Sequence, residues 1–439
     1  MTPNPALIKS VEQLNYRVTV GDVAAQAGLE INQAQQGLLA LASEAGGHLQ
    51  VAESGDIAYL FPKNFRSILR NKYLRLRLKE WWDKIWAVLF YLMRISFGII
   101  LIVSIVLIFA AIAIIIITIS ASDSDNNSGG SRNRSGGGGI FFFPRFWIGP
   151  DIFWFFDPNY SPRSRQRSQN RRSSNENELN FLEAVFSFLF GDGNPNADLE
   201  ARRWQQIGAV IRNHRGAVVA EQIIPYLDNF DNRSDNEDAL LPVLTRFNGY
   251  PEVSPEGEII YYFPELQVTA KNQSFLAVSE YLQEHLWRFS RAGSGQLISA
   301  AALGAVNIIG ALVLNSLLQD GQIAAQIGGL VAFVDSIYWL LLGYGTAFLT
   351  IPLLRYFWIQ WKNSRLQTRN QKRETRALAL NSGDRHLQQK INYARQFATE
   401  KVIGEENLTY STETDLLDQE IERSAQIDAE WERRLDSGA

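Results

Sequence analysis

Few side chains in this sequence are arranged in a pattern that performs chemistry. The chain has no cysteine, which excludes disulfides, thiolate nucleophiles and cysteine-ligated iron–sulfur clusters. Its four histidines are scattered without the spacing of metal ligands and are expected to be surface or packing residues: His48, His214, His285 and His386. A P-loop, a dinucleotide-binding glycine motif and a nucleophile elbow are also missing from the sequence. We therefore expect no enzyme, no metal and no cofactor.

Three charged residues interrupt strongly apolar stretches. Asp335 stands between Val334 and Ser336, while Arg145 and Asp151 lie six positions apart in an aromatic stretch. An ionisable group in a membrane segment is costly and is a candidate for function, so Asp335 suggests a small transporter or channel subunit. The simpler interpretation, which we prefer, is a hydrogen bond between Asp335 and Asn307 or Asn315 of a neighbouring helix. Arg145 and Asp151 can pair with each other or reach the membrane surface.

A duplicated segment provides the framework for the soluble part of the chain. Gly55-Asp-Ile-Ala-Tyr-Leu-Phe-Pro62 reappears as Gly257-Glu-Ile-Ile-Tyr-Tyr-Phe-Pro264, and the match continues upstream without a gap. Such self-similarity indicates two copies of one small domain.

The first copy predicts helices followed by a hairpin. Val18–Leu29 has a helix-turn-helix pattern, with Thr19 as a helix N-cap and Gly28 in the turn. Two alternating runs, His48–Val51 and Asp56–Phe61, then predict a hairpin. This order is typical of a winged helix over 1–62, and 199–266 fits the same template less regularly. The fold class is therefore mixed, with two winged-helix-like α+β modules on a helical transmembrane scaffold.

Aromatic side chains alternate along the last strand of each copy. Tyr59 and Phe61 fall on one face of that strand, as do Tyr261 and Phe263. We expect these four residues to hold each hairpin onto its helices, because burial of an aromatic ring stabilises a core by a few kcal/mol.

The charge of the first copy argues against DNA binding, although winged helices often bind DNA. Residues 1–62 have a net charge of −4, and the helix expected over 31–43 has no cation to contact phosphates. We therefore assign its amide side chains to a protein partner and do not expect nucleic acid as a partner. These side chains are Asn32, Gln33, Gln35 and Gln36.

Long apolar segments indicate an integral membrane protein that contacts membrane lipid. The segment 95–119 is uncharged over 25 residues, and 297–318 and 327–354 are further candidate spans. The aromatic segment 140–157 is shorter and is broken by prolines. Basic clusters precede the first span, follow the aromatic segment and follow the last span, so the positive-inside rule favours four crossings with both modules in the cytoplasm. The alternative is an interfacial aromatic segment that leaves one module on the far side.

The remaining segments complete the expected order. They are a basic amphipathic juxtamembrane segment at 63–94, a Ser/Gly-rich linker at 120–139, a basic linker with an amphipathic helix at 158–198, an amphipathic helix at 267–296 and a charged helical tail at 355–439.

Several of these motifs together resemble a known family. The repeated Gly-(Asp/Glu)-Ile-x-Tyr-x-Phe-Pro motif, the Ser/Gly-rich linker and the run from Phe146 to Pro158 are similar to an uncharacterised family of cyanobacterial and plastid integral membrane proteins. The resemblance implies a thylakoid or plasma membrane. Plant members of the family are labelled as iron–sulfur cluster biosynthesis proteins, but this chain has no cysteine to carry a cluster.

These observations lead to an expected function. We expect a membrane-anchored, non-enzymatic docking or assembly scaffold whose modules contact a membrane or cytoplasmic protein. A role with photosynthetic membrane complexes follows from the resemblance alone. The alternatives are a membrane-bound DNA-binding regulator and a small transporter or channel subunit that uses Asp335.

Overall fold

The computed structural model describes residues 4–72, 74–124, 180–228, 236–271, 276–318, 322–380, 384–404 and 407–437. The aromatic segment 140–157, with Arg145 and Asp151, lies outside the described residues, as do most of the Ser/Gly-rich linker and the basic linker. The chain divides into two compact units. The modular unit comprises Met1–Trp82, Pro195–Leu286 and Arg365–Ala439, and the helical unit comprises Asp83–Asn194 and Trp287–Ser364.

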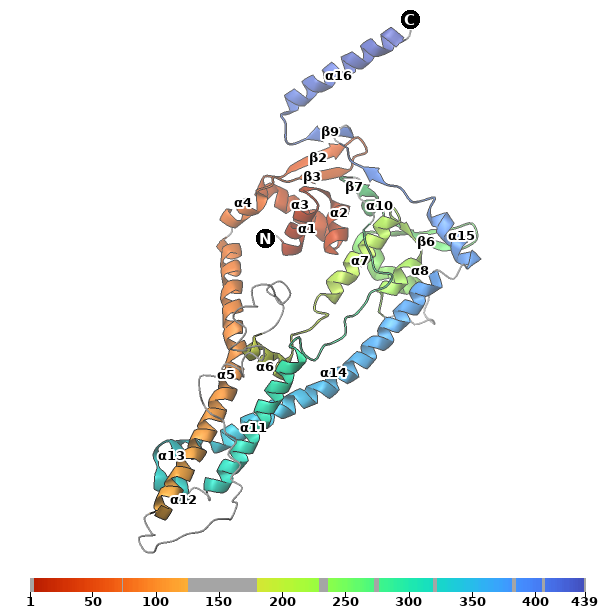
Figure 1. Ribbon diagram of the computed structural model, residues 1–439. Helices are drawn as coiled ribbons and strands as arrows, with labels where there is room; N and C mark the ends of the chain where they lie inside the picture. Colours follow the sequence, from red (N-terminus) through yellow and green to blue (C-terminus); the bar gives the residue numbers. More distant parts are fainter. Residues whose placement is uncertain are drawn as a thin grey trace, which may run out of the picture. The chain divides into compact units, whose positions relative to one another are not determined.

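The first module contains the helices and the hairpin expected from the sequence (Figure 1). Its elements are α1 (Pro5–Gln13), β1 (Arg17–Thr19), α2 (Val20–Ala27), α3 (Ile31–Ala45), β2 (His48–Ala52) and β3 (Ile57–Leu60). Strand β3 pairs antiparallel with both β1 and β2. The Thr19 side chain caps α2 in a capping box closed by Asp22, and Gly28 ends α2 with a φ of 65°. Both features follow the sequence prediction.

The second module repeats this order with a less regular middle. Its elements are α7 (Leu199–Asn213), β4 (Ala217–Val218), α8 (Ala220–Ile223), the 3-10 turn η3 (Ile224–Tyr226), α9 (Asn236–Phe247), β5 (Tyr250–Val253) and β6 (Ile259–Tyr262). Strand β6 lies between β4 and β5. The counterpart of α2 is only one short helix and a 3-10 turn. Pro225 lies in the first turn of that element, which begins at Ile224, because proline is tolerated there and not in a helix interior.

A matching backbone hydrogen bond supports the duplication. The amide of Phe61 donates to the carbonyl of Tyr16 at 2.8 Å, and the amide of Phe263 donates to that of Gly216 at 2.8 Å. Tyr16 and Gly216 both have positive φ, at 68° and 76°. The chain therefore reverses in the same unusual way after the first helix of each module.

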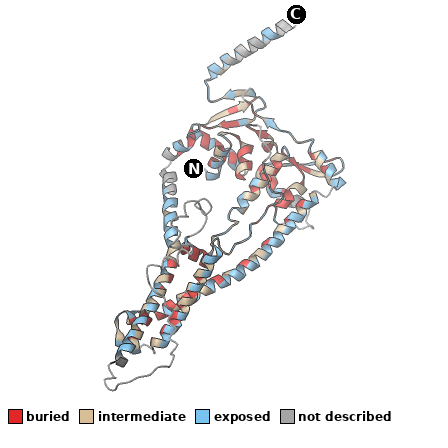
Figure 2. Cartoon of the chain, in the orientation of Figure 1, coloured by how far each residue is buried: buried red, intermediate tan, exposed pale blue. Residues whose placement is uncertain are grey.

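The aromatic residues of each hairpin lie in the core of their own module, as predicted. Tyr59 and Phe61 belong to the first core, and Tyr261 and Phe263 belong to the second. Figure 2 shows in red the buried residues that make up these cores.

The first core continues beyond the boundary expected at Pro62. Helix α4 (Phe65–Lys72) places Phe65 and Leu69 in that core, and both are fully buried. A boundary at residue 62 is therefore too early, because it would remove two core side chains from the module.

The C-terminal tail is not simply the charged helical segment expected. After the long helix α14 (Tyr338–Leu380) come α15 (Arg385–Ala394), β8 (Lys401–Val402), β9 (Leu408–Ser411) and α16 (Leu416–Ser437). Strand β9 pairs antiparallel with β2 and extends the first sheet to the order β1-β3-β2-β9. Strand β8 pairs in parallel with β7 (Val268–Thr269). Backbone pairing with distant strands therefore overrides the local helical pattern.

The prediction of an amphipathic helix over 267–296 is wrong. After α10 (Pro264–Gln267) and β7, residues 276–293 form no helix or strand. Four asparagine side chains each bind both the N–H and the C=O of one residue in this segment: Asn213 on Leu276, Asn370 on Glu284, Asn196 on His285 and Asn363 on Trp287. These side chains satisfy backbone groups that a helix would otherwise pair internally. We call residues 276–286 the strap.

Within the described residues, the helical unit and its continuations contain three helices long and apolar enough to cross a membrane, as judged by length and composition. These stretches are Trp81–Ala121 within α5 (Leu74–Ser124), α11 (Ser294–Leu318) and α14. The unit also holds α6 (Phe181–Phe190), α12 (Gln322–Ile327) and α13 (Gly329–Ser336). The span expected at 327–354 is therefore not continuous, since α13 ends at Ser336 and α14 begins at Tyr338. Gly328 and Gly329, both with positive φ, precede this break.

Glycines permit close packing between the long apolar helices. A side chain at Gly304 of α11 would collide with Phe348 of α14, and one at Gly345 of α14 would collide with Asn307 of α11. Gly304 lies on the buried face of α11 together with Ala300, four residues earlier. This contact agrees with the small-residue spacing in the sequence.

Candidate interaction site

The amide side chains assigned to a partner share the outward face of α3. Asn32, Gln33, Gln35 and Gln36 are all exposed, whereas the inward face of α3 contributes Ile31, Ala34 and Leu38 to the core. Leu39 is also exposed, at 54%. We call Asn32, Gln33, Gln35, Gln36 and Leu39 the α3 surface. It offers amide donors and acceptors beside one apolar side chain and has no formal charge.

Helix α2, by contrast, is packed against the second module. A side chain at Gly208 of α7 would collide with Ala25 of α2, and one at Gly28 would collide with Trp204 of α7. Ala25 is buried in the core cluster of the second module. The two copies therefore fold against each other through α2 and α7, and this face of the first module is not open to a partner.

A buried carboxylate fixes this contact between the modules. Asp22 is only 1% exposed and accepts hydrogen bonds from the amides of Thr19 at 2.8 Å and Ala270 at 3.0 Å. It also accepts from the Thr269 hydroxyl at 3.1 Å and pairs with Arg212 of α7. A buried charge is tolerated only when it is paired and hydrogen-bonded in this way.

Arg246 adds a second polar link between the modules. Its guanidinium lies 4.3 Å from the Trp204 ring centre and donates to the carbonyl of Gly28 at 2.7 and 2.9 Å. A cation is favourable there because Gly28 ends α2, where helix carbonyls are unpaired. Burial lowers the pKa of Arg246, while Glu200 and Glu30 act in the opposite direction.

The outer edge of β2 is also occupied. The amide of Leu49 donates to the Thr412 hydroxyl at 2.9 Å, and the amide of Thr412 donates to the carbonyl of Leu49 at 3.0 Å. Residue 251, the counterpart of Leu49 in the second module, is a proline. Pro251 has no N–H to donate, so β5 cannot accept a strand in the same way.

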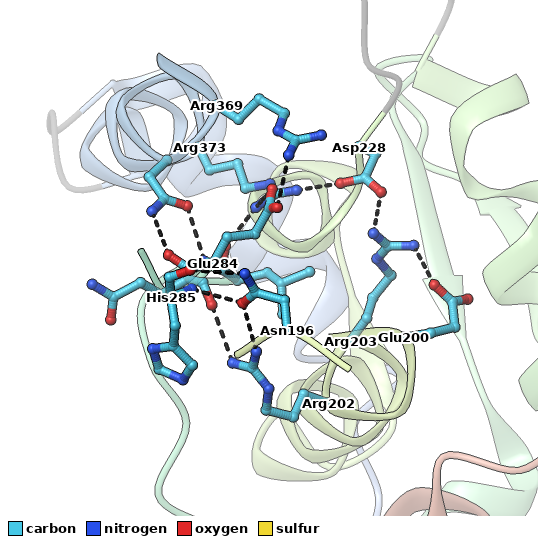
Figure 3. A network of polar contacts seen from close by, with 12 residues as sticks. Asn196, Glu200, Arg202, Arg203, Asp228, Glu284, His285, Arg369 and Arg373 are labelled. Atoms are coloured by element: carbon cyan, nitrogen blue, oxygen red, sulfur yellow. Dashed lines mark hydrogen bonds and ion pairs between the residues drawn. The ribbon is translucent and has the colours of Figure 1, made fainter. Parts of the chain in front are cut away.

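A chain of ion pairs anchors the strap (Figure 3). Glu284 is buried and pairs with Arg373 at 3.1 Å and with Arg369 at 2.9 Å, both on α14. Arg373 also pairs with Asp228, which in turn pairs with Arg203 of α7. Each of the two carboxylates is thus shared between two arginines. This compensation fits an anchoring role.

The part of the chain that the structure describes shows no cluster of three or more His, Asp or Glu able to hold a metal ion. His386 is exposed, and its Nε2 lies 2.8 Å from Oε1 of Glu258. His48 and His214 each contact a backbone carbonyl through Nδ1.

Asp335 does not make the hydrogen bond expected for it. Asn307 is fully buried, and its amide nitrogen donates instead to the Ser104 hydroxyl of α5 at 2.6 Å. Asn315 is exposed, and Asp335 is half-buried near the end of α13. Among the described residues, the side chain of Asp335 has no hydrogen-bond partner, while its backbone carbonyl accepts from the amide of Ile337.

Some of these residues carry a sequence signal and others do not. The Thr19-x-x-Asp22 spacing is that of a capping box, so it predicts the local role of Asp22. No spacing predicts its pairing with Arg212, 190 positions away, or the pairing of Glu284 with α14. Such contacts depend on the tertiary fold.

Comparison with known proteins identifies one relative that matches nearly the whole chain. The uncharacterised protein At5g03900 of Arabidopsis thaliana, described as chloroplastic, is 39% identical over 441 residues. The match covers 97% of this chain and 81% of the relative. No family model matches the chain, and no solved structure matches it.

Proposed function

This chain belongs to the family of the chloroplastic Arabidopsis thaliana protein At5g03900, and we propose that it is a membrane-anchored scaffold that docks a protein partner through the α3 surface. The chloroplastic relative and the three apolar helices support association with a plastid-type membrane. We propose a thylakoid or plasma membrane, with both modules on the cytoplasmic side. A photosynthetic membrane complex is the proposed type of partner.

We further propose that both modules are winged helices. The order of helix, strand, helix, helix and hairpin supports this assignment for the first module, and the matching order supports it for the second. We do not propose DNA binding, because α3 carries no cation and the first module, to which it belongs, is acidic.

One observation supports docking at α3 more than any other. In the first module, α2 is covered by α7 and the edge of β2 is covered by β9, whereas the α3 surface is exposed. A surface of four amides beside one leucine can make several hydrogen bonds to a protein. Binding there avoids the free-energy cost of removing a charged group from water.

Charged substitutions on α3 test the proposal. In the full chain, Gln33→Glu with Gln36→Glu should reduce recovery of the partner complex from native membranes at least roughly tenfold, which corresponds to about 1.4 kcal/mol. The melting temperature should stay unchanged, because both side chains are exposed. The measurement is quantitative mass spectrometry of affinity-purified protein.

The matched control is Gln388→Glu with Gln389→Glu, which adds the same charge on the exposed face of α15. This variant should recover the partner like the wild type. Equal recovery for both double variants would contradict docking at α3.

A second candidate function follows from Asp335, whose side chain has no hydrogen-bond partner among the described residues. We infer a proton- or cation-linked transport role as the alternative, because such a carboxylate in a membrane protein often lies on an ion pathway. Asp335→Asn should then abolish a proton or cation flux into proteoliposomes that the wild type shows. Equal flux through both proteins would exclude this alternative.

A further inference from the structure

Helix α16 leaves a large apolar stripe uncovered. Leu417, Ile421 and Trp431 are 68%, 65% and 62% exposed. Their spacings of four and ten residues place all three on one side of a helix. Large exposed apolar side chains grouped in this way usually mark a contact with another molecule.

The charge around this stripe is strongly negative. Residues 413–437 contain nine carboxylates and three arginines, which gives a net charge of −6. We call this segment the acidic arm. Anionic lipid headgroups and nucleic acids would both repel it, so its apolar stripe is unsuited to a membrane surface or to DNA. Its partner must therefore combine apolar and basic groups.

The chain itself contains a segment of that chemistry. Residues 63–82 hold seven cations and one carboxylate, a net charge of +6. Leu78, Trp81 and Trp82 are about 60% exposed in this segment, which runs through α4 into α5. We call it the basic surface.

The basic surface is not needed to cross the bilayer. The apolar stretch of α5, Trp81–Ala121, has 41 residues, whereas a hydrocarbon core requires only about 20. The uncharged segment 95–119 satisfies that requirement alone. Residues before Trp82 can therefore contact protein outside the hydrocarbon core.

One copy does not bring these two surfaces together. Both belong to the modular unit, yet Leu78, Trp81 and Trp82 of the basic surface remain exposed within it, as do the three apolar side chains of the arm named above. Pairing of two acidic arms is disfavoured by like charge. We propose that the acidic arm docks on the basic surface of a second copy, and that the exchange is reciprocal. The result is a two-fold symmetric dimer with two identical contacts.

Mass measurement of the full-length protein in nanodiscs tests the proposal. At about 50 mM salt, where the Debye length is roughly 14 Å, the wild type should form dimers. Raising the salt roughly tenfold should weaken them, because it screens the attraction between the two surfaces. Asp418→Arg with Glu420→Arg should weaken dimerisation at least about tenfold. Lys63→Glu with Lys79→Glu, made in the wild type, should weaken the dimer to a similar extent, because it lowers the net charge of the basic surface while the first pair of changes lowers that of the arm.

The control is Glu252→Arg with Glu256→Arg, which makes the same charge change on two exposed residues of the second module. This control should leave the dimer intact. A monomeric wild type at low salt would overturn the proposal. An undiminished dimer in the variant Asp418→Arg with Glu420→Arg would overturn it as well. A monomer in which the arm crosslinks to its own basic surface would show docking within one copy and would also overturn it.

Discussion

At the scale of single residues, Tyr226 joins the second core to the strap. Its hydroxyl donates to the carbonyl of Ser279 at 2.5 Å, and its ring is buried in the core of the second module. Burial, with a smaller contribution from Glu280, raises the pKa of Tyr226 to about 12. The folded protein therefore favours the neutral phenol more strongly than the unfolded chain does.

This shift predicts a loss of stability in alkali. The stabilisation from Tyr226 is complete below the unfolded pKa of about 10 and is lost as pH rises towards 12. The loss is on the order of 2–3 kcal/mol, since each pKa unit corresponds to about 1.4 kcal/mol. Tyr226→Phe should lower stability at pH 8 by removing one hydrogen bond, but should reduce the further loss between pH 10 and 12.

Chemical denaturation of both proteins across this pH range is the measurement. Other tyrosines also ionise there, so the difference between wild type and Tyr226→Phe is the informative quantity. If the stability difference between the two proteins did not change from pH 8 to pH 12, Tyr226 would not be the responsible group.

At the scale of secondary structure elements, the strap depends on side-chain amides in place of a regular ladder. Asn370→Ala leaves the N–H and the C=O of Glu284 without their partner. Each unpaired buried group costs about 1–3 kcal/mol, so the strap should open more often. Hydrogen exchange of the peptide that contains Glu284 should then become at least about tenfold faster.

Asn392→Ala serves as the control for this experiment, because Asn392 is exposed on α15. It should leave exchange in the strap unchanged. Equally slow exchange in Asn370→Ala would mean that the ion pairs of Glu284 hold the strap without help from Asn370.

A comparison of the strap with the two modules shows where sequence analysis succeeds and where it fails. Local signals predict Thr19 as a cap, Gly28 as a turn and the burial of Phe61 and Phe263, because each depends on neighbours within a few residues. The strap lacks such a local determinant. Its apolar pattern suggests a helix, but the side chains that bind its backbone lie far away in the sequence. They are Asn213 on α7, Asn370 on α14 and Asn196 just before α7.

The candidate site divides in the same way. Helical periodicity predicts that Asn32, Gln33, Gln35 and Gln36 are exposed, because the apolar residues of α3 define its buried face. It does not predict that β9 covers the edge of β2, since β9 is separated from β2 by most of the chain. The assignment of these amides to a protein partner stays a prediction.

At the scale of the whole molecule, the contact between α5 and α6 bears on how the chain would cross a membrane. Leu182 of α6 packs against Gly98 of α5, whereas α5 ends at Ser124. These positions on α5 are separated by about 39 Å at 1.5 Å per residue, which exceeds the thickness of a hydrocarbon core. Helix α6 therefore contacts the middle of α5, near the start of its uncharged segment 95–119.

This separation leads us to expect four crossings, with both modules on one side. Protease added to the cytoplasmic face of oriented vesicles should digest both modules and α16. Protease added to the opposite face should leave them intact. Digestion of a single module from each face would instead indicate an odd number of crossings between them.

The strand β9 has a consequence for how the protein is made. It pairs with β2 in a sheet whose other strands lie within residues 17–60, yet it is translated long after them. At 5–20 residues per second, the roughly 360 residues between β2 and β9 take about 20–70 s to translate. During that time the nascent first module has an open strand edge, which other chains can pair with. The second module has Pro251 at the equivalent edge and needs no late strand. The module that is synthesised first is therefore the last to be completed.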